Sequence, residues 1–433
     1  MENKQTNKET QKKQEPQKNK VPQAATLEDK PFFSDKKNVV RLIAFLVAFV
    51  IGVGGISYGV YRIGYKEPGT YEIEADPDGD LPYYSSGVTM YYTFDGSSKQ
   101  IREKMLAVKS RYTIDLKQTY QWFDAQNTYL GVVNLATVNQ SPDQPITVPE
   151  PLFAALEDAL VKTDEGQGYS VFAGPLETLR DSLIYATDPT DVDPISDPSL
   201  AETAAALADV IRNDPGTLSL DADARTVTLH ISDAYAALLA QYGLEPCVLS
   251  LGLLRDAYRV QYLVKQLEDQ GFTNGYLTTE SGMTVLLRDC AAASYCFYSL
   301  TAAGKVVMSA TQAAASGTAA CCFRLFGLYE DEVGFYTMTR NGATIYRHPY
   351  MSSFTETQPV MAAMAISGNR NIVTACYTCV CLFAAETQEQ AETLAKNADL
   401  TVIMDLNDGE NVLRITSDEG LSTVESFTVQ TVA

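Results

Sequence analysis

A run of 20 residues without a charged side chain, from residue 42 to residue 61, constrains this chain most. In a helix such a run spans about 30 Å, which is the thickness of the hydrocarbon core of a bilayer. A secretory signal has a shorter apolar region and a cleavage site of small residues, so an uncleaved anchor fits this run better. We therefore predict one transmembrane helix over 39–62, held by membrane lipid through residues 42–61.

Charged residues are divided unevenly on the two sides of this run. Residues 1–41 carry ten Lys and Arg against six Asp and Glu, whereas the rest of the chain carries 23 against 48. Basic residues stay on the cytoplasmic side of an anchor, so we predict a disordered cytoplasmic tail over 1–38 and an extracytoplasmic C-terminal domain of a single-pass cell-membrane protein. The acidic body repels polyphosphate backbones, which argues against nucleic-acid binding.

The chain after the anchor mixes short strands with amphipathic helices. Residues 63–85 hold Pro, Gly and Asp and are predicted to be a linker containing one short strand, "TYEIEA". Residues 86–417 contain strand-like runs such as "SGVTMYYTF" and helical apolar faces such as "PEPLFAALEDALVKTD". These elements do not alternate as βαβ units, which favours an α+β fold with a mixed sheet and packed helices. Residues 418–433 are expected to form a C-terminal tail.

Three of the eight cysteines, Cys376, Cys379 and Cys381, form a C-x-x-C-x-C pattern that suggests a metal or redox site. They lie within the apolar run "IVTACYTCVCLFAA", and no second cysteine pair or nearby histidine completes a tetrahedral site. Free cysteine is among the most buried residue types. We therefore interpret these cysteines as core residues and assign no metal ligands.

The stretch "VLSLGLLRDAYRV", residues 248–260, combines an apolar run, a glycine and the start of a helix. That combination commonly holds a phosphate, because N–H groups at a helix N-terminus bind anions. Here the first helical turn carries Asp256, whose charge repels a phosphate. Two interpretations stay open: Asp256 is a water-facing residue favoured by the helix dipole and no phosphate is held, or the neighbouring Arg255 supplies the cation.

The order of these elements resembles the FAD:protein FMN transferase (ApbE) family, collinearly over residues 86–417. "YSVFAGPLETL" keeps the Gly-Pro-Leu of one family motif, and "LSLGLLRDAY" keeps the leucine, first glycine and tyrosine of another. "IYRHPY" keeps a Tyr-x-His, and Ser316-Gly317 matches a Ser-Gly pair near the flavin. Asp256 stands where the family has a lysine, and Cys376 and Val380 stand where it has a metal-binding aspartate and threonine.

The resemblance implies a chemistry as well as a fold. Members of the family bind FAD and Mg²⁺ and move FMN onto a threonine or serine of a target protein, releasing AMP. By this resemblance the remains of the cofactor cleft are lined by Gly252, Asp256, Gly282, Ser316, Gly317 and His348. A hydrogen-bonded position on the surface is the favoured alternative for His348. FAD is the candidate cofactor, whereas Mg²⁺ is not expected, because a soft cysteine sulfur and a valine do not replace hard oxygen ligands.

Three functions remain open. The favoured one is a degenerate relative that keeps the scaffold as a flavin-binding or partner-binding module, with a protein partner on the extracytoplasmic side. The second is an active Mg²⁺-dependent FMN transferase, and the third is an unrelated extracytoplasmic structural module. The charge at Asp256 favours the first, because two unit charges at about 4 Å interact by about 4 kcal/mol at an effective dielectric near 20.

Overall fold

The computed structural model describes residues 40, 44–45, 47–49, 51–53, 65–76, 87–301, 303–330, 332–351, 354, 358–424 and 426–432. The chain divides into two compact units, 1–65 and 66–433. In the first unit the described residues before residue 54 are helical. Across the described residues, no helix combines the length and apolar character needed to cross a bilayer. The tail predicted over 1–38 and most of the anchor predicted over 39–62 lie outside the described residues.

The second unit is built on a nine-stranded sheet. Its order is β1 (Gly69–Ile73), β2 (Val88–Phe94), β6 (Gly275–Thr279), β7 (Met283–Leu286), β10 (Ala319–Arg324), β13 (Val360–Ser367), β14 (Thr401–Leu406), β15 (Val412–Ile415) and β17 (Thr428–Thr431). Neighbouring strands are antiparallel except β15 and β17, which are parallel. Strand β13 lies near the middle of the sheet, and every one of its residues is buried, as expected for a strand covered on both faces.

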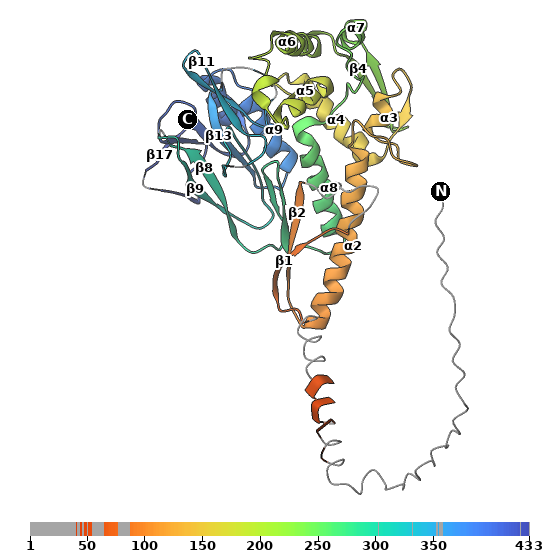
Figure 1. Ribbon diagram of the computed structural model, residues 1–433, viewed down its shortest axis with the longest axis vertical. Coiled ribbons are helices and arrows are strands. Elements are labelled where there is room, and N and C mark those ends of the chain that lie inside the picture. The colour runs from red at the N-terminus through yellow and green to blue at the C-terminus, as the bar shows by residue number, and fades with distance from the viewer. Residues whose placement is uncertain are drawn as a thin grey trace, which may run out of the picture. The chain divides into compact units, whose positions relative to one another are not determined.

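Two cores cover the two faces of the sheet, because side chains alternate along each strand. On one face, Ala363 and Ala365 of β13 pack in a core with side chains of helices α2 (Ser98–Trp122), α8 (Arg255–Asp269) and α9 (Ile372–Phe383). On the other face, Ala362 and Met364 pack against strands β8 (Ala293–Leu300) and β9 (Val306–Ala314), which form a three-stranded sheet with β16 (Leu421–Thr423). In Figure 1, α8 runs beside α2, and the two helices are in contact.

The remaining elements form a helical region with a small sheet. Its members are α3 (Leu135–Asn139), α4 (Glu150–Asp164), α5 (Gly174–Ile184), η2 (Pro189–Asp191), α6 (Pro198–Asn213), α7 (Asp233–Tyr242) and the sheet β3 (Ile146–Thr147), β5 (Thr226–Ile231), β4 (Gly216–Asp221). A short helix η3 (Gly252–Leu254) precedes α8, a hairpin pairs β11 (Tyr336–Arg340) with β12 (Ala343–Arg347), and α10 (Gln388–Asn397) follows α9.

Polar residues at the helix starts explain several helix boundaries. Ser97 accepts the N–H of Gln100, and the Gln100 side chain accepts the N–H of Ser97, so α2 begins with a capping box. Asp197 caps α6 just before Pro198, which needs no hydrogen bond for its nitrogen. Gly243 ends α7 in the left-handed conformation with φ of 63°.

The α+β class and the large mixed sheet are confirmed, and the sheet extends past both expected edges of the domain. The strand expected inside the linker over 63–85 is β1, and it pairs with β2 as the edge of the nine-stranded sheet. The tail expected over 418–433 contributes β16 and β17, and β17 forms the other edge. Each edge strand joins the sheet by pairing with one neighbour, and that pairing is not visible in the strand's own residues.

Candidate functional site

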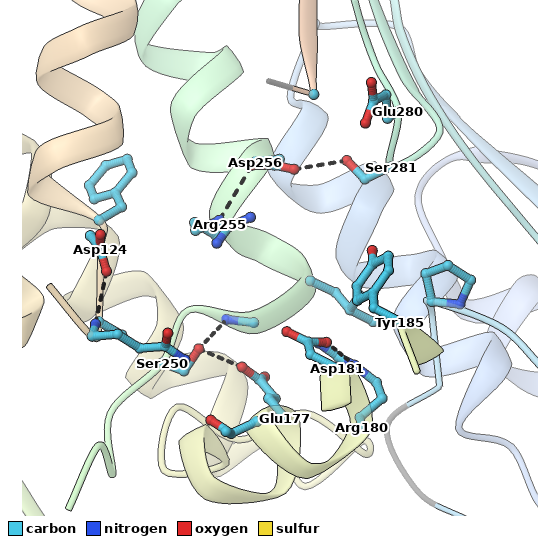
Figure 2. A pocket seen from close by; sticks show the side chains of 18 of the residues that line it. Asp124, Glu177, Arg180, Asp181, Tyr185, Ser250, Arg255, Asp256, Glu280 and Ser281 are labelled. Carbon is cyan, nitrogen blue, oxygen red and sulfur yellow. Dashed lines mark hydrogen bonds and ion pairs between the residues drawn. The ribbon is translucent and has the colours of Figure 1, made fainter. Parts of the chain in front are cut away.

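A cleft of about 640 Å³ opens where five segments of the second unit meet. The segments are the end of α2 with the loop after it, the exposed side of α5, residues 247–254 with the first turns of α8, the β6–β7 turn, and residues 332–350. The volume lies within the range of about 300–1,000 Å³ that is typical of small-molecule sites. Figure 2 labels side chains from the first four of these segments around the cleft.

Helix α5 lies against residues 247–252 at the cleft because two glycines leave room for this contact. A Cβ on Gly174 would lie 1.9 Å from the carbonyl oxygen of Cys247, so only glycine fits where the helix begins. Gly252 has φ of +52°, and a Cβ there would lie 2.1 Å from Oε1 of Glu177. These contacts bring the first turn of α5 against η3 and place Glu177 at the cleft.

Glu177 is joined to Ser250 at the base of the cleft. The Ser250 hydroxyl donates to Oε2 of Glu177 at 2.5 Å and accepts the backbone N–H of Gly252 at 3.0 Å. Burial raises the pKa of Glu177, although Arg180 and the hydrogen bond from Ser250 oppose the rise. The carboxyl group therefore holds its proton to a higher pH than an ordinary surface glutamate does.

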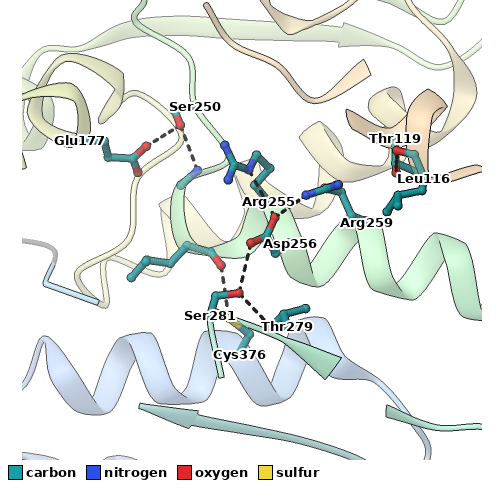
Figure 3. A network of polar contacts seen from close by, with 12 residues as sticks. Leu116, Thr119, Glu177, Ser250, Arg255, Asp256, Arg259, Thr279, Ser281 and Cys376 are labelled. Carbon is teal, nitrogen blue, oxygen red and sulfur yellow. Dashed lines mark hydrogen bonds and ion pairs between the residues drawn. The ribbon is translucent and has the colours of Figure 1, made fainter. Parts of the chain in front are cut away.

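Asp256 sits in an ion-pair network on the first turn of α8 (Figure 3). Its Oδ1 lies 3.0 Å from Nη1 of Arg259 and 3.5 Å from Nε of Arg255, and its Oδ2 accepts the Ser281 hydroxyl at 3.1 Å. Burial alone would raise the pKa of Asp256, but Arg255 and Arg259 outweigh it and lower that pKa. The interpretation of a water-facing Asp256 is wrong, because its side chain is only 15% exposed. Arg255 is 55% exposed and reaches into the cleft (Figure 2).

Acidic groups outnumber basic ones along the cleft. Its carboxylates are Asp124, Glu177, Asp181, Asp256, Glu280 and Glu332, and its guanidinium groups are Arg180, Arg255 and Arg259. Arg180 is bound to Asp181, with Nε and Nη2 at 3.0 and 2.9 Å from Oδ1. The surplus of negative charge favours neutral or cationic ligands over a diphosphate.

Five aromatic side chains contribute to the apolar part of the lining. They are Tyr120, Phe123, Tyr185, Phe335 and Tyr350. Tyr185 is 63% exposed. Trp122, the residue before Phe123, packs edge-on against Tyr262 with ring centres 5.6 Å apart. Phe123 and Tyr350 are only 2% and 3% exposed, so Tyr185 is the ring most open to a planar ligand.

The structure brings together only part of the predicted cofactor-binding set. Gly252 and Asp256 are among the described residues that line the cleft, and Gly282, Ser316, Gly317 and His348 are not. Gly282 lies behind Ser281, where a Cβ would be 2.2 Å from the carbonyl oxygen of Cys322. Gly317 follows β9 and donates its N–H to the carbonyl oxygen of Leu287 at 3.3 Å.

His348 is a core residue that supports the cleft from behind. It is 2% exposed, and its ring lies 6.0 Å from that of Tyr350 and 5.5 Å from that of Phe383. The expectation of a surface histidine is therefore wrong. Burial, with Arg347 and Arg180 nearby, lowers the pKa of His348 to about 3. The ring is neutral at physiological pH, and its neighbours Pro349 and Tyr350 line the cleft.

The cysteines of the C-x-x-C-x-C pattern are buried, as predicted. Cys376 and Cys379 are 0% exposed and Cys381 is 6% exposed, and all eight thiols of the chain are free. The Cys376 thiol donates to the carbonyl oxygen of Leu253 at 3.4 Å, beneath η3 (Figure 3). Cys379 donates to the carbonyl oxygen of Cys321 at 3.3 Å.

Magnesium does not fit these residues. The sealed Cys376 thiol and Val380, which is 2% exposed, offer no oxygen ligands. Within the described ranges, no group of three or more His, Cys, Asp or Glu side chains is arranged to hold a metal ion.

The sequence did not predict Glu177 and Arg180 of α5, Tyr185 directly after it, or Ser281 of the β6–β7 turn as site residues. The first three follow Gly174-Pro175 at intervals that place them along one side of a helix. Part of that signal was available, because a proline in the first turn of a helix marks where the helix begins. No sequence signal indicated Ser281, since it comes next to Asp256 only when β6 and β7 pair.

Comparison with models of protein families and with curated proteins gives no match. Solved structures do match. The ApbE protein from Thermotoga maritima superposes with a TM-score of 0.52 at 13% identity, covering 82% of this chain and 97% of that one. The flavin transferase ApbE from Vibrio cholerae gives 0.45 at 13% identity, covering 83% and 99%, and the flavinyl transferase ApbE of Pseudomonas stutzeri gives 0.49 at 11% identity, covering 84% and 97%. At these identities the likeness concerns the fold, and the second unit has an ApbE-like fold.

Proposed function

We propose that this chain is a ligand-binding module on an ApbE-like fold that binds a flavin or a related planar ligand in its cleft and carries out no Mg²⁺-dependent FMN transfer. The observation that carries the proposal is the state of Cys376. At the position that the resemblance assigns to a metal-binding aspartate, the side chain is a fully buried thiol that donates a hydrogen bond to the carbonyl oxygen of Leu253. Phosphoryl transfer depends on neutralising charge on the transferred group, and Cys376 and Val380 offer no oxygen ligands for the Mg²⁺ that would do so.

The rest of the cleft supports binding without transfer. Its volume and aromatic lining suit a planar ring, and Tyr185 offers an exposed face. The surplus of carboxylates opposes a diphosphate, and Asp256 takes up the charge of Arg259 in an internal ion pair. A flavin ring is therefore better accommodated than the complete FAD molecule with its metal.

The test is calorimetric titration of the full chain with riboflavin, FMN and FAD, each with and without Mg²⁺, together with chromatographic detection of AMP. We expect the affinity for FAD to be independent of Mg²⁺ and no AMP to be released. The flavin transferase ApbE from Vibrio cholerae serves as the positive control. Tighter binding of FAD in Mg²⁺, or release of AMP, would refute the proposal.

A second candidate, an active FMN transferase, is favoured by one observation. Arg255 places an exposed guanidinium in the cleft beside Asp256, where it could hold a phosphate in place of the lysine of the family. If this candidate is correct, Arg255→Gln abolishes AMP release from FAD. If the module only binds the ring, the same substitution leaves riboflavin affinity within about threefold.

We also propose that residues 42–61 anchor the chain in the cell membrane, with 66–433 outside. The support is the uncharged run and the basic residues before it. Protease added to intact cells should digest the part after residue 66 and spare residues 1–38. Protection of the whole chain would reject this orientation.

A further inference from the structure

Ser250 and Glu177 meet at the base of the cleft in an arrangement that ligand binding alone does not require. We infer that they form a nucleophile–base pair that hydrolyses small carboxylic esters without a metal ion. This inference is independent of the proposed flavin binding, because its test follows a covalent bond to Ser250 and not the binding of a flavin.

The geometry is that of an activated serine. The hydroxyl points its proton at Oε2 of Glu177 over 2.5 Å, which is within reach for direct proton transfer. The N–H of Gly252 donates to the same Oγ at 3.0 Å and stabilises negative charge that develops on it. Both side chains line the cleft, so a substrate can reach them.

Glu177 is held in position and has the basicity that the role needs. The missing side chain of Gly252 leaves room for Oε1, and the first turn of α5 is fixed where Gly174 meets Cys247. Burial raises the pKa of Glu177. A base whose pKa is closer to the working pH accepts a proton more readily than an ordinary glutamate.

Charge in the cleft selects acyl over phosphoryl transfer and limits the substrate. Arg255 is exposed and lies close enough to Glu177 to act on its charge, so one guanidinium is available for a single oxyanion. A transferring phosphoryl group carries more charge than one guanidinium offsets. Since carboxylates outnumber guanidinium groups, the acyl group should be neutral or cationic and small enough for the cleft.

The reaction balances with water as the only co-reactant. The Ser250 proton moves to Glu177 while Oγ bonds to the carbonyl carbon, and the carbonyl electrons move to oxygen. The bond to the leaving alcohol then breaks, and the alcohol takes the proton from Glu177. Water gives a proton to Glu177 and attacks the acyl-serine, and Ser250 recovers its proton as the acid leaves.

The test treats the full chain with p-nitrophenyl acetate and, separately, with a fluorophosphonate probe, and locates the modified residue by mass spectrometry. We expect a burst of p-nitrophenol and one probe per chain on Ser250. Ser250→Ala should abolish both signals, and Glu177→Gln should slow acylation about 10²–10⁴-fold. The rate in the natural chain should rise with pH as Glu177 loses its proton, and this rise should be absent in Glu177→Gln.

The control is Ser182→Ala in α5, the helix that carries Glu177. It removes an exposed hydroxyl that donates to the carbonyl oxygen of Leu179, and it should leave the burst unchanged. If Glu177→Gln does not fold, the pH profile and the site of labelling in the natural chain decide the question. Absence of labelling, labelling at another serine, or an unchanged rate in folded Glu177→Gln would each overturn the inference. None of these results alters the AMP measurement, so the two proposals fail separately.

Discussion

Two aspartate–arginine sites in the second unit show how the same chemistry serves different ends. Asp193 and Arg347 pair at 2.7 Å, and both side chains are 0% exposed. Asp256 pairs with Arg259 at 3.0 Å, but its other neighbour, Arg255, is 55% exposed at the cleft. We call Asp193 and Arg347 the sealed pair, because both are buried, and Asp256 with Arg255 and Arg259 the open site. The sealed pair joins elements of the fold to one another, whereas the open site leaves one cation available to a ligand.

The sealed pair connects segments far apart in the chain. Asp193 lies in the loop before α6, and Arg347 ends β12. Tyr336 of β11 also donates to Asp193, at 2.9 Å. The β11–β12 hairpin is thereby tied to the helical region, and the residues just after β12 line the cleft. The closed site thus supports one wall of the open one.

The largest expected effect comes from breaking the sealed pair. Arg347→Met leaves a buried carboxylate without this cation, so we expect the free energy of unfolding to fall by about 3–5 kcal/mol in urea titrations followed by circular dichroism. Replacing Asp193 by Asn in the same chain should recover much of the loss. Equal losses in the single and double variants would show that the charge left on Asp193 is not the cause.

A third aspartate sharpens the comparison, because none of the described arginines is hydrogen-bonded to it. Asp405 of β14 is 2% exposed, and its Oδ2 lies buried without a hydrogen-bond partner among the residues that the structure describes. Burial raises the pKa of Asp405 to about 7. A hydrogen bond from Ser299 opposes this rise, and the charge of Asp408 adds to it. At Asp193, burial alone would raise the pKa, but hydrogen bonds from Arg347 and the N–H of Ile195 outweigh it and lower the pKa.

The two shifts have opposite signs in a pH titration. Because folding tightens the proton on Asp405, its contribution to stability is present below the unfolded pKa of 3.8 and is lost as pH rises to about 7. The loss is at most about 4 kcal/mol. The contribution of Asp193 is instead lost on acidification. We expect Asp405→Asn to stabilise the protein at pH 8 relative to the natural chain and to give no such gain at pH 4. A difference that does not change with pH would contradict the assignment.

The smallest expected effect comes from the open site. Arg255→Met removes a half-exposed cation, so the free energy of unfolding should change by less than about 1 kcal/mol. Arg259→Met is the matched comparison, because its side chain is only 3% exposed and its loss leaves Asp256 with the more exposed arginine alone. Thermal unfolding of the two variants ranks them. If the two variants lose the same stability, Arg255 is held by the fold as firmly as Arg259 and is not available to a ligand.

The sequence predicted well those elements whose own side chains determine them. The strand over 86–94 appears as β2, and helical faces appear as α4 and α8, because their apolar periods match the burial pattern. The short strand "TYEIEA" was predicted but placed in a linker, and β17 was assigned to the tail, because the pairing that adds each of them to the sheet is made with another segment of the chain. The strand β8 was missed, although its alternate residues are buried.

The site was less predictable for a physical reason. Asp256 and Gly252 were found because they follow one another in a recognisable turn, but their partners come from elsewhere in the chain. Glu177 lies 73 positions before Ser250, and Ser281 lies 25 positions after Asp256. Spacing along a chain does not encode such contacts, which arise only once the helices and the sheet have packed.

The end of α2 has a practical consequence. Trp122 is the only tryptophan of the chain, and the two residues that follow it, Phe123 and Asp124, line the cleft. Its indole is partly buried against Tyr262, so its emission depends on the state of this corner of the molecule. The protein therefore carries its one native indole next to two residues that line the cleft. With excitation selective for tryptophan, the proposed entry of an aromatic ligand should quench this one indole, without any added label.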